Sequence, residues 1–345
     1  MNTFTRAASL TRFDTVAREC GLDPARLLLE VGLDACIPAD PDTRLPAARF
    51  AALLELAAVR SRTENFGLRM AQHRRLSNLG PVGMLVRDQP TLGDALQALA
   101  SQYPRLNNAL VARLDWGDDI VVVRLDLILG CPQPVRQAIE MVTSVLLGVV
   151  RGPMGPLWQP RMVHFMHAPP RDRSLHLSVF GSKLAFDQEF NGLAINRSDL
   201  ATSNPAADPA AARYAEQLIE RLLYKYPPQA VTDAVRHLVV GLLPQGLCTI
   251  DQVADPLGMT PRTLQRKLAE QGAVFSDLVD AVRLELAERC LVEARCPLTD
   301  LAQRLGFTSG SAFSRWYMAH TGTSPSKRRQ AAGHSLGDPP LPLTR

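Results

Sequence analysis

The chain has 345 residues, of which 46% are hydrophobic and 21% charged, with a formal net charge of +4 at pH 7. This length exceeds the roughly 150 residues typical of one domain, so two domains are expected, and the composition is ordinary for a globular protein. The mild basic excess permits a polyanionic partner but does not require one.

Three features together predict a cytoplasmic protein. The longest apolar run, VTSVLLGVV at 142–150, falls short of the roughly 20 residues of a membrane-spanning helix. The opening residues MNTFTRAASL contain no apolar core followed by a small-residue cleavage site, so export is not expected. The six cysteines are scattered without a C-x-x-C pair, which favours buried free thiols over a disulfide framework.

The segment before residue 110 is predicted to be largely helical. Residues 45–58, LPAARFAALLELAA, carry apolar side chains at helical spacing, with Pro46 in the first turn, where its missing N–H is tolerated. Residues 91–103, TLGDALQALASQY, repeat the pattern, with Thr91 as the expected N-cap.

After residue 110 the spacing of apolar residues changes from helical to strand-like, which indicates a small sheet. Residues 112–128 hold β-branched runs around a Gly-Asp-Asp turn, which predicts a hairpin. One strand is expected at 161–167 and one or two more at 183–195, whereas 135–152 is long enough for a buried helix. The fold class expected for this part is mixed α/β with a small, mostly antiparallel sheet.

The remainder is predicted to be all helix. ATSNPAADPAA at 201–211 breaks every periodic pattern and indicates a linker. The helix expected at 212–226 could help to form a dimer or pack on its own domain, and the two are equally compatible with its apolar spacing. The proline-rich GDPPLPLTR at 337–345 predicts a disordered tail.

One short turn occurs twice in this helical part. LGMTPRTLQRKL at 257–268 and LGFTSGSAFSRWY at 305–317 share Leu-Gly, an apolar residue and threonine, and their Leu-Gly pairs lie 48 positions apart (305 − 257). A helix, a tight turn with glycine and a second helix that is polar on one face form a helix-turn-helix. The pattern therefore predicts two such motifs, each offering arginine from its second helix.

Local signals mark both turns. In the first, Gly258 supplies the left-handed conformation that ends a helix, and Thr260 caps the next one. In the second, Gly306 ends the helix, and either Thr308 or Ser309 caps its successor. The segment between the turns, 276–293, carries a broad apolar stripe and would span about 27 Å as a helix. Adjacent major-groove segments lie roughly 34 Å apart, so this helix is a credible spacer.

At these residues the chain resembles the AraC/XylS family of bacterial transcription regulators. The likeness covers roughly Val231 to Ala332 and includes AFSRWYMAHTGTSPSKRR at 312–329, an aromatic-rich helix followed by the specific T-G-x-S-P turn. Residues 45–200 are similar to the arabinose-binding-type sensor domain of the branch that includes the ornithine-utilisation regulators. The matching stretches are FGLRMA (66–71), PTLGDALQAL (90–99), PRMVHFMHAPP (160–170) and FDQEFNGLAINRSDL (186–200).

The resemblance implies a set of DNA contacts. Arginine and glutamine can bind guanine and adenine edges with two hydrogen bonds, and the residues matched to the bases of the first groove are Arg262, Gln265 and Arg266. Less sequence information is expected from the matching residues of the second groove, which are Gly310, Ser311, Ala312 and Arg315. The expected phosphate contacts are Thr263, Lys267, Ser314 and Lys327.

The same resemblance implies an organisation and a set of partners. The expected parts are an effector-sensing and dimerisation domain at 1–200, a linker with its helix at 201–226, a DNA-binding domain with two helix-turn-helix motifs at 227–332, and a disordered tail at 333–345. The expected partners are double-stranded promoter DNA, a small-molecule effector, a second copy of the chain and RNA polymerase. No cofactor, metal or membrane is expected, and family members most often activate transcription.

Two departures from the family pattern bear on these contacts. Pro256 stands in the last turn of the first helix, where it removes a backbone donor and should distort that turn. The basic cluster KRR at 327–329 fits a phosphate contact and a solvated helix end equally well.

Other functions have less support. His164 and His167 are three apart on a predicted strand and would point to opposite faces, so a shared metal is not expected. No catalytic constellation appears, so an enzyme is not expected. A different class of function remains open: the N-terminal domain could dock another protein or only dimerise, which would leave a constitutive DNA-binding protein. The sequence does not identify the effector pocket; the candidates, each more often core or surface, are Trp116, Arg124, Arg136, His164 and Phe165.

Overall fold

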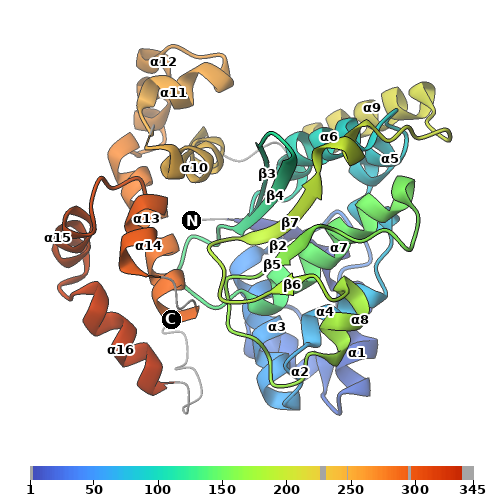
Figure 1. Ribbon diagram of the computed structural model, residues 1–345, viewed down its shortest axis with the longest axis horizontal. Coiled ribbons are helices and arrows are strands. Elements are labelled where there is room, and N and C mark those ends of the chain that lie inside the picture. The colour runs from blue at the N-terminus through green and yellow to red at the C-terminus, as the bar shows by residue number, and fades with distance from the viewer. Residues whose placement is uncertain (1–2, 226–230, 247, 294–296, 336–345) are drawn as a thin grey trace.

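The computed structural model describes residues 3–225, 231–246, 248–293 and 297–335. An N-terminal part combines helices with a sheet, and a C-terminal part made only of helices lies along one side of it (Figure 1). The predicted pairing of a mixed α/β part with an all-helical part is confirmed. Among the helices of the described ranges, none combines the length and the apolarity that crossing a membrane demands.

Five strands form the main sheet, in the spatial order β3-β4-β7-β5-β6. Neighbouring strands are antiparallel except for β5 and β6, which run parallel, so the sheet is mostly antiparallel as predicted. β3 and β4 form the predicted hairpin, in which the Gly117 N–H donates to the Ile120 carbonyl (2.9 Å). The strands are β3 (Leu110–Trp116), β4 (Ile120–Leu127), β5 (Met162–His164), β6 (Leu184–Ala185) and β7 (Asn191–Asn196), with a separate pair β1 (Phe4–Arg6) and β2 (Arg44–Pro46).

The alternating side chains of β4 give this hairpin two different faces. Val121, Val123, Leu125 and Leu127 are buried, and α7 (Arg136–Met154) packs on the sheet. Successive side chains of a strand point to opposite faces. Arg124 and Asp126 therefore lie on the other face, beside the C-terminal helices.

The helices of the N-terminal part include the predicted ones with small shifts. The helix expected at 45–58 begins at Ala47, because Pro46 is extended and ends β2 instead of lying in the first helical turn. Thr91 caps α6 as predicted and accepts a hydrogen bond from the Asp94 N–H (3.1 Å). The helices are α1 (Phe13–Glu19), α2 (Pro24–Glu30), α3 (Ala47–Ser61), α4 (Phe66–Gln72), α5 (Pro81–Arg87), α6 (Leu92–Leu106), α7, α8 (Ser174–Phe180) and α9 (Pro209–Lys225).

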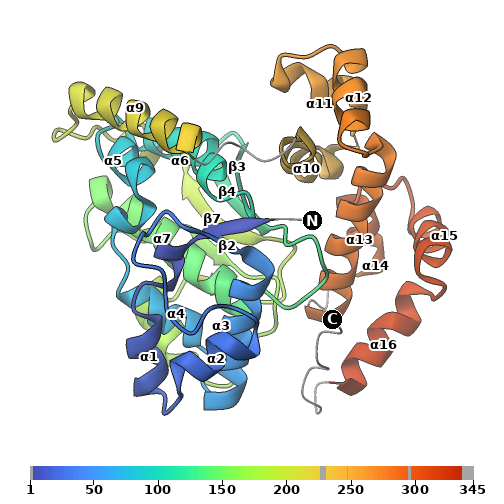
Figure 2. The same ribbon diagram turned by 180° about the vertical axis from the view of Figure 1, so that it is seen from behind.

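The described part of the predicted linker belongs to the N-terminal core. The Leu92 N–H donates to the Thr202 carbonyl (3.1 Å), and α9 lies along α5 (Figure 2). Ala215, Ile219 and Leu223 of α9 are buried in the same apolar cluster as the sheet. Of the two roles left open for this helix, packing on its own domain is the one observed. The passage to the C-terminal part, 226–230, lies outside the described residues.

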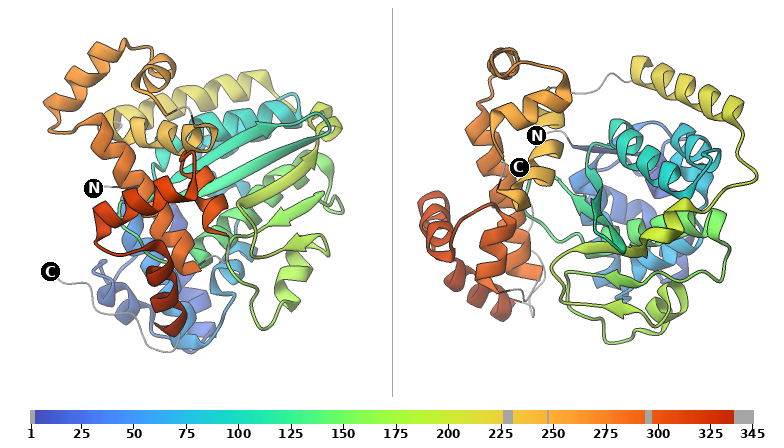
Figure 3. Two further views of the ribbon diagram at one scale, coloured as in Figure 1. Left: turned by 60° about the vertical axis from the view of Figure 1, so that its left-hand side comes forward. Right: turned by 45° about the horizontal axis from the view of Figure 1, so that its top comes forward.

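Seven α-helices form the described C-terminal part, which lies beside β3 and β4 (right view of Figure 3). They are α10 (Val231–Leu242), α11 (Ile250–Ala254), α12 (Pro261–Glu270), α13 (Phe275–Glu293), α14 (Leu298–Arg304), α15 (Gly310–Thr321) and α16 (Pro325–Ser335). Helix α16 includes the first residues of the predicted disordered tail, and 336–345 lie outside the described residues. Of the five described cysteines only Cys290 is buried, so the expectation of buried thiols was wrong for the others.

A buried polar cluster crosses the N-terminal core. The Glu140 carboxylate on α7 is fully buried and lies 3.0 Å from His176 Nε2, 3.4 Å from His167 Nε2 and 3.2 Å from Arg136 Nε. Burial lowers the pKa of His167 to about 4, and the nearby Glu140 opposes this shift only in part. His164, by contrast, packs on the ring of Phe190 (4.4 Å between ring centroids). The two histidines of the predicted strand therefore have separate surroundings.

This cluster predicts a pH dependence of stability. The folded chain holds His167 neutral down to a pKa of about 4, whereas an unfolded histidine takes up its proton near pH 6.5. The unfolded state therefore binds more protons between these values, so the free energy of unfolding should fall as the pH drops from 6.5 towards 4. Urea unfolding of wild type and His167→Asn across this range tests it. The variant should show a shallower decline, though not a flat line, because burial also lowers the pKa values of His164 and His237.

Candidate functional site

The first turn joins α11 to α12 in what we term the first helix pair. Leu264 and Leu268 are almost fully buried and hold α12 on the C-terminal core. The side chains of Arg262, Gln265 and Arg266 are exposed, whereas those of Thr263 and Lys267 are partly exposed. The first three are spaced i, i+3 and i+4 along a helix, which places them on one face. The three residues expected to face bases therefore share one solvent-accessible surface.

Local chemistry fixes how this pair is bent. Thr249 and Gln252 form a capping box at the start of α11, and Thr260 accepts a hydrogen bond from the Thr263 N–H (3.2 Å) at the start of α12. The α-helical conformation ends at Ala254, and residues 255–257 form a short 3-10 turn that contains Pro256. The predicted distortion at Pro256 is thus a tightening of the last turn, which Gly258 then ends in the left-handed region (φ 63°).

The second turn joins α14 to α15 in the second helix pair. Ser309, not Thr308, is the cap, since its hydroxyl oxygen accepts a hydrogen bond from the Ala312 N–H (3.1 Å). Phe313 and Tyr317 are fully buried. Ser311 and Arg315 are exposed, Gly310 and Ser314 partly so, and the Ser314 hydroxyl donates to the Gly310 carbonyl (2.8 Å).

Most expected DNA-contact residues therefore fall into two groups, on α12 and on α15. Lys327 stands apart from both, on α16, where it is exposed. Within the basic cluster 327–329, Arg328 Nε donates to Glu288 Oε2 (2.8 Å), so this residue fastens α16 to α13. Arg266 Nε lies 3.6 Å from Glu270 Oε1, and both side chains are largely exposed. A pair of this kind contributes little to stability, so Arg266 can exchange Glu270 for another acceptor.

Helix α13 carries both pairs. Leu278, Val279 and Val282 pack with the core beneath α12, whereas Ala287, Cys290 and Leu291 pack with the core beneath α15. The broad apolar stripe predicted for this helix thus serves two neighbours. Helices α12 and α15 lie on outer sides of the C-terminal part, away from the N-terminal part (Figures 1 and 2).

The same helix also contacts the N-terminal part, through Glu285. Its side chain is buried, and burial raises the pKa of its carboxyl group. The Leu129 and Gly130 N–H groups donate to its two carboxylate oxygens (2.6 and 3.0 Å), and Arg289 Nη2 donates as well (2.9 Å). The segment that follows β4 is thereby fastened to the middle of the helix that carries both helix pairs.

Further contacts join the two parts beside Glu285. Asn108 Nδ2 donates to Asp233 Oδ2 (2.9 Å), and Arg113 Nη1 donates to the Gly241 carbonyl (2.7 Å). Val111 and Ile128 belong to the apolar cluster of the C-terminal helices, although the chain places them in and after the β3–β4 hairpin. The hairpin is thus part of the interface between the two parts.

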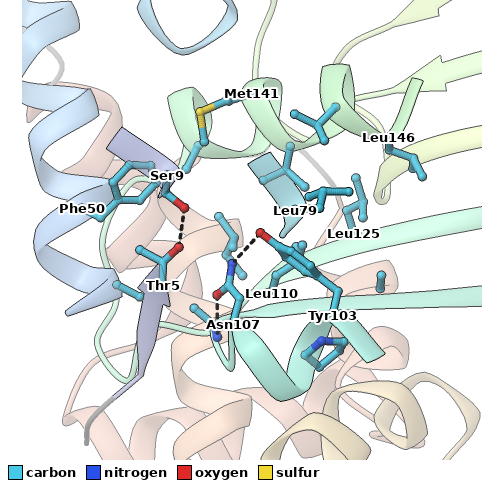
Figure 4. Close-up of a pocket in the computed structure, with 18 of the residues that line it drawn as sticks. Thr5, Ser9, Phe50, Leu79, Tyr103, Asn107, Leu110, Leu125, Met141 and Leu146 are labelled. Carbon is cyan, nitrogen blue, oxygen red and sulfur yellow. Dashed lines mark hydrogen bonds between the residues drawn. The ribbon is translucent and has the colours of Figure 1, made fainter. Parts of the chain in front are cut away.

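The other face of this hairpin lines a narrow cavity in the N-terminal part (Figure 4). The cavity has a volume of about 60 Å³, and its walls come from α3, α6, α7, β3 and β4. Of its 23 lining residues, 17 are apolar and six have polar side chains, namely Thr5, Ser9, Arg74, Asn78, Tyr103 and Asn107. A mostly apolar wall with a few polar side chains is the kind of lining that ligand sites have.

None of the five pocket candidates drawn from the sequence lines this cavity. Phe165 is part of the core and Trp116 is largely exposed. Arg124 lies on the opposite face of β4, and the alternation of β4 could have excluded it. The residues that do line the cavity come from segments far apart in the chain, so no local pattern marks them.

Both parts of the chain match known protein families. Residues 21–204 match the family described as "Arabinose-binding domain of AraC transcription regulator, N-term", and residues 253–331 match "Helix-turn-helix domain". The chain is 29% identical to the HTH-type transcriptional regulator VirS of Mycobacterium tuberculosis, over 96% of this chain and 97% of that one.

Two further proteins are similar over most of their length. The ornithine utilization regulator of Pseudomonas aeruginosa is 29% identical, over 92% of this chain and 91% of that one. The crystal structure of the regulator CdpR from the same species covers 89% of this chain and 96% of that one, at 24% identity and a TM-score of 0.42. The match to the arabinose-binding domain extends over more than half of the chain, and the helix-turn-helix match begins within α11 and includes α12, α14 and α15. The chain therefore belongs to the AraC family of DNA-binding transcription regulators.

Proposed function

We propose that the protein is an activator of transcription that a small-molecule effector controls through the N-terminal part. The observation that carries this proposal is the β3–β4 hairpin, which lines the cavity with one face and contacts the C-terminal helices with the other. Leu129 combines both roles, because it lines the cavity while its N–H donates to Glu285. A ligand that moves Leu129 would alter the seat of α13, and a shift between two arrangements requires only such a differential contact.

We further propose that both helix pairs are helix-turn-helix motifs that enter adjacent major grooves of one promoter. Helix α13 has 19 residues, which span about 28 Å at 1.5 Å per residue, and adjacent groove segments lie roughly 34 Å apart. The two motifs would act unequally: α12 offers Arg262, Gln265 and Arg266, whereas α15 offers chiefly Arg315.

Membership of the family supports the remaining assignments. We propose a cytoplasmic homodimer that contacts RNA polymerase, with an effector and dimerisation domain that extends through α9 and a DNA-binding domain at 227–332. The name of one relative refers to ornithine utilization, which is in keeping with small-molecule control here. A metabolite screen on the full chain tests the proposal: at least one compound should raise the melting temperature and change the affinity for promoter DNA. A chain with constant affinity in every compound would be a constitutive DNA-binding protein instead.

Replacing Arg266 with alanine should weaken binding to selected duplexes by about 1–3 kcal/mol and relax the preference at one base pair. The duplexes are those that the wild-type protein enriches from a random pool. Arg266 is exposed on the base-facing side of α12, where a guanidinium can bind guanine through two hydrogen bonds. Electrophoretic mobility shifts on the enriched duplex and its single-base variants measure both effects.

Lys327→Ala is the matched control for this substitution. Its side chain is exposed on α16, where a phosphate contact would carry no sequence information. We expect a similar loss on every duplex and a salt dependence reduced by about one charge. Equal affinity and equal base preference in Arg266→Ala would show that α12 does not read bases.

A further inference from the structure

Two carboxylates of α13 hold the helix α15, which lies beside it (Figure 2). Asp280 Oδ1 accepts a hydrogen bond from Trp316 Nε1 (3.0 Å). Glu288 Oε1 accepts one from the hydroxyl of Tyr317. The two donors are consecutive residues of α15, whereas the two acceptors are eight positions apart on α13 (288 − 280), about 12 Å along the helix axis. The two helices are therefore joined at two separate points.

The Asp280 carboxylate has contacts on both sides of this junction. Its Oδ2 lies 3.5 Å from His320 Nε2, one turn after Trp316 on α15. Its Oδ1 lies 3.5 Å from Nη1 of Arg283. Arg283 Nε in turn donates to the Leu305 carbonyl (3.0 Å) at the end of α14. Asp280 thus joins α13 to α15 directly and, through Arg283, to the turn that precedes α15.

The Glu288 carboxylate fixes the second point. Its side chain is only 12% exposed, and its Oε2 accepts a hydrogen bond from Arg328 Nε of α16 (2.8 Å). Burial and the Glu288 carboxylate raise the pKa of Tyr317, so the hydroxyl keeps its proton and remains a donor. Glu288 therefore holds α15 and α16 on α13 at the same place.

These contacts fix the direction of α15 in a way that apolar packing does not. Leu264 and Leu268 seat α12 through apolar contacts, which have no preferred direction. A hydrogen bond weakens steeply as its angle departs from linear. Two such bonds at separate points restrict both the rotation of α15 about its axis and its pivoting over α13. A helix that offers chiefly Arg315 to the bases, yet is held at two points, contributes position more than base recognition.

We propose that Asp280 and Glu288 are positioning residues that fix the direction of α15 on α13, and thereby the spacing of the two groove sequences that the protein accepts. This inference rests on the proposed entry of both helix pairs into adjacent major grooves and adds the residues that set their separation. One inserted base pair would move the second groove sequence by about 3.4 Å and turn it by about 35° around the duplex. A loosened α15 can follow this displacement, whereas a firmly held one loses its contacts.

The test measures binding of the full chain to two duplexes by electrophoretic mobility shift. One is a duplex that the wild-type protein enriches from a random pool, and the other has one base pair inserted between its two footprinted groove sequences. Wild type should bind the second at least about tenfold more weakly, because it gives up the contacts of one groove. In Asp280→Ala and in Tyr317→Phe this ratio should fall about fivefold, since each variant loses a hydrogen bond to a charged group. Tyr317→Phe keeps the buried ring and with it the fold.

Three further variants separate positioning from charge and from packing. Asp277→Ala is the matched control for Asp280→Ala, because Asp277 is an exposed acid of the same helix whose carboxylate accepts from the Ser276 hydroxyl (3.2 Å). It removes the same negative charge and should keep the wild-type ratio. Asp280→Asn retains an acceptor oxygen for Trp316 Nε1 and should keep most of the ratio. The double variant Asp280→Ala/Trp316→Phe should lose no more than Asp280→Ala, because both changes break one hydrogen bond.

The outcomes distinguish this inference from the proposed function. A purely structural role would weaken binding to both duplexes equally, so wild-type ratios in Asp280→Ala and Tyr317→Phe would overturn the inference while two-groove binding stands. A wild-type ratio in one of the two would remove that carboxylate from it. If wild type binds both duplexes equally well, the proposed binding to adjacent grooves itself fails.

Discussion

Replacing Glu285 with alanine should lower the free energy of unfolding by about 3–5 kcal/mol, the range measured when one partner of a buried ion pair is removed. The carboxylate accepts from Arg289 and from the Leu129 and Gly130 N–H groups. Alanine would leave the buried Arg289 guanidinium without this partner, and the two N–H groups with it. Urea unfolding of the purified full chain measures the effect.

The same substitution should change DNA binding without touching the DNA-facing residues. Glu285 is the point at which α13 holds the segment after β4, so its loss removes the hydrogen bond between α13 and Leu129, which lines the cavity. We expect the affinity of Glu285→Ala for its promoter to be the same with and without effector, whereas the wild-type affinity responds. Glu285→Gln is the matched control: its amide keeps one of the two acceptor oxygens, and the variant should retain part of both the stability and the response. A response of wild-type size in Glu285→Ala would place the coupling elsewhere.

The local structure could be predicted from the sequence because it depends on neighbouring residues. A Gly-Asp-Asp turn between β-branched runs predicted the β3–β4 hairpin, and Thr91 and Thr260 cap their helices as their positions indicated. Capping and turn formation involve residues two to four apart. The expected DNA-contact residues of α12 could be predicted in the same way, because their shared face follows from helical spacing alone.

The contacts that join the two parts could not be predicted in this way. Glu285 and Leu129 are 156 residues apart. No local pattern in the sequence distinguishes Glu285 from the other charged residues of α13. The cavity likewise brings Arg74 together with Ser9 and with residues of β3 and β4, which are distant from it in the chain. Such residues become visible only when the tertiary fold shows which charges are buried and which partners they have. The sequence therefore predicted the expected DNA-contact surface more completely than the contacts through which a ligand could control it.

The second large effect concerns Phe313, whose replacement by alanine should destabilise the C-terminal part by about 3–5 kcal/mol. Its ring is fully buried and lies against those of Phe307 and Tyr317, with centroids 5.7 and 5.8 Å away. These rings fill the core that seats α15 on α13 and α14. Alanine would leave a cavity at the base of α15, and thermal unfolding of the full chain should show a lower melting temperature.

Ser311→Ala separates this packing effect from direct contact with DNA. Ser311 is exposed on the same helix, so its loss should change the free energy of unfolding by less than about 0.5 kcal/mol. If α15 mainly positions the protein on the duplex, Phe313→Ala should weaken binding to all duplexes alike, because the whole helix loses its seat. Base preferences should then stay those set by α12. A changed preference in Phe313→Ala would mean instead that α15 reads bases, and wild-type stability would contradict its placement in the core.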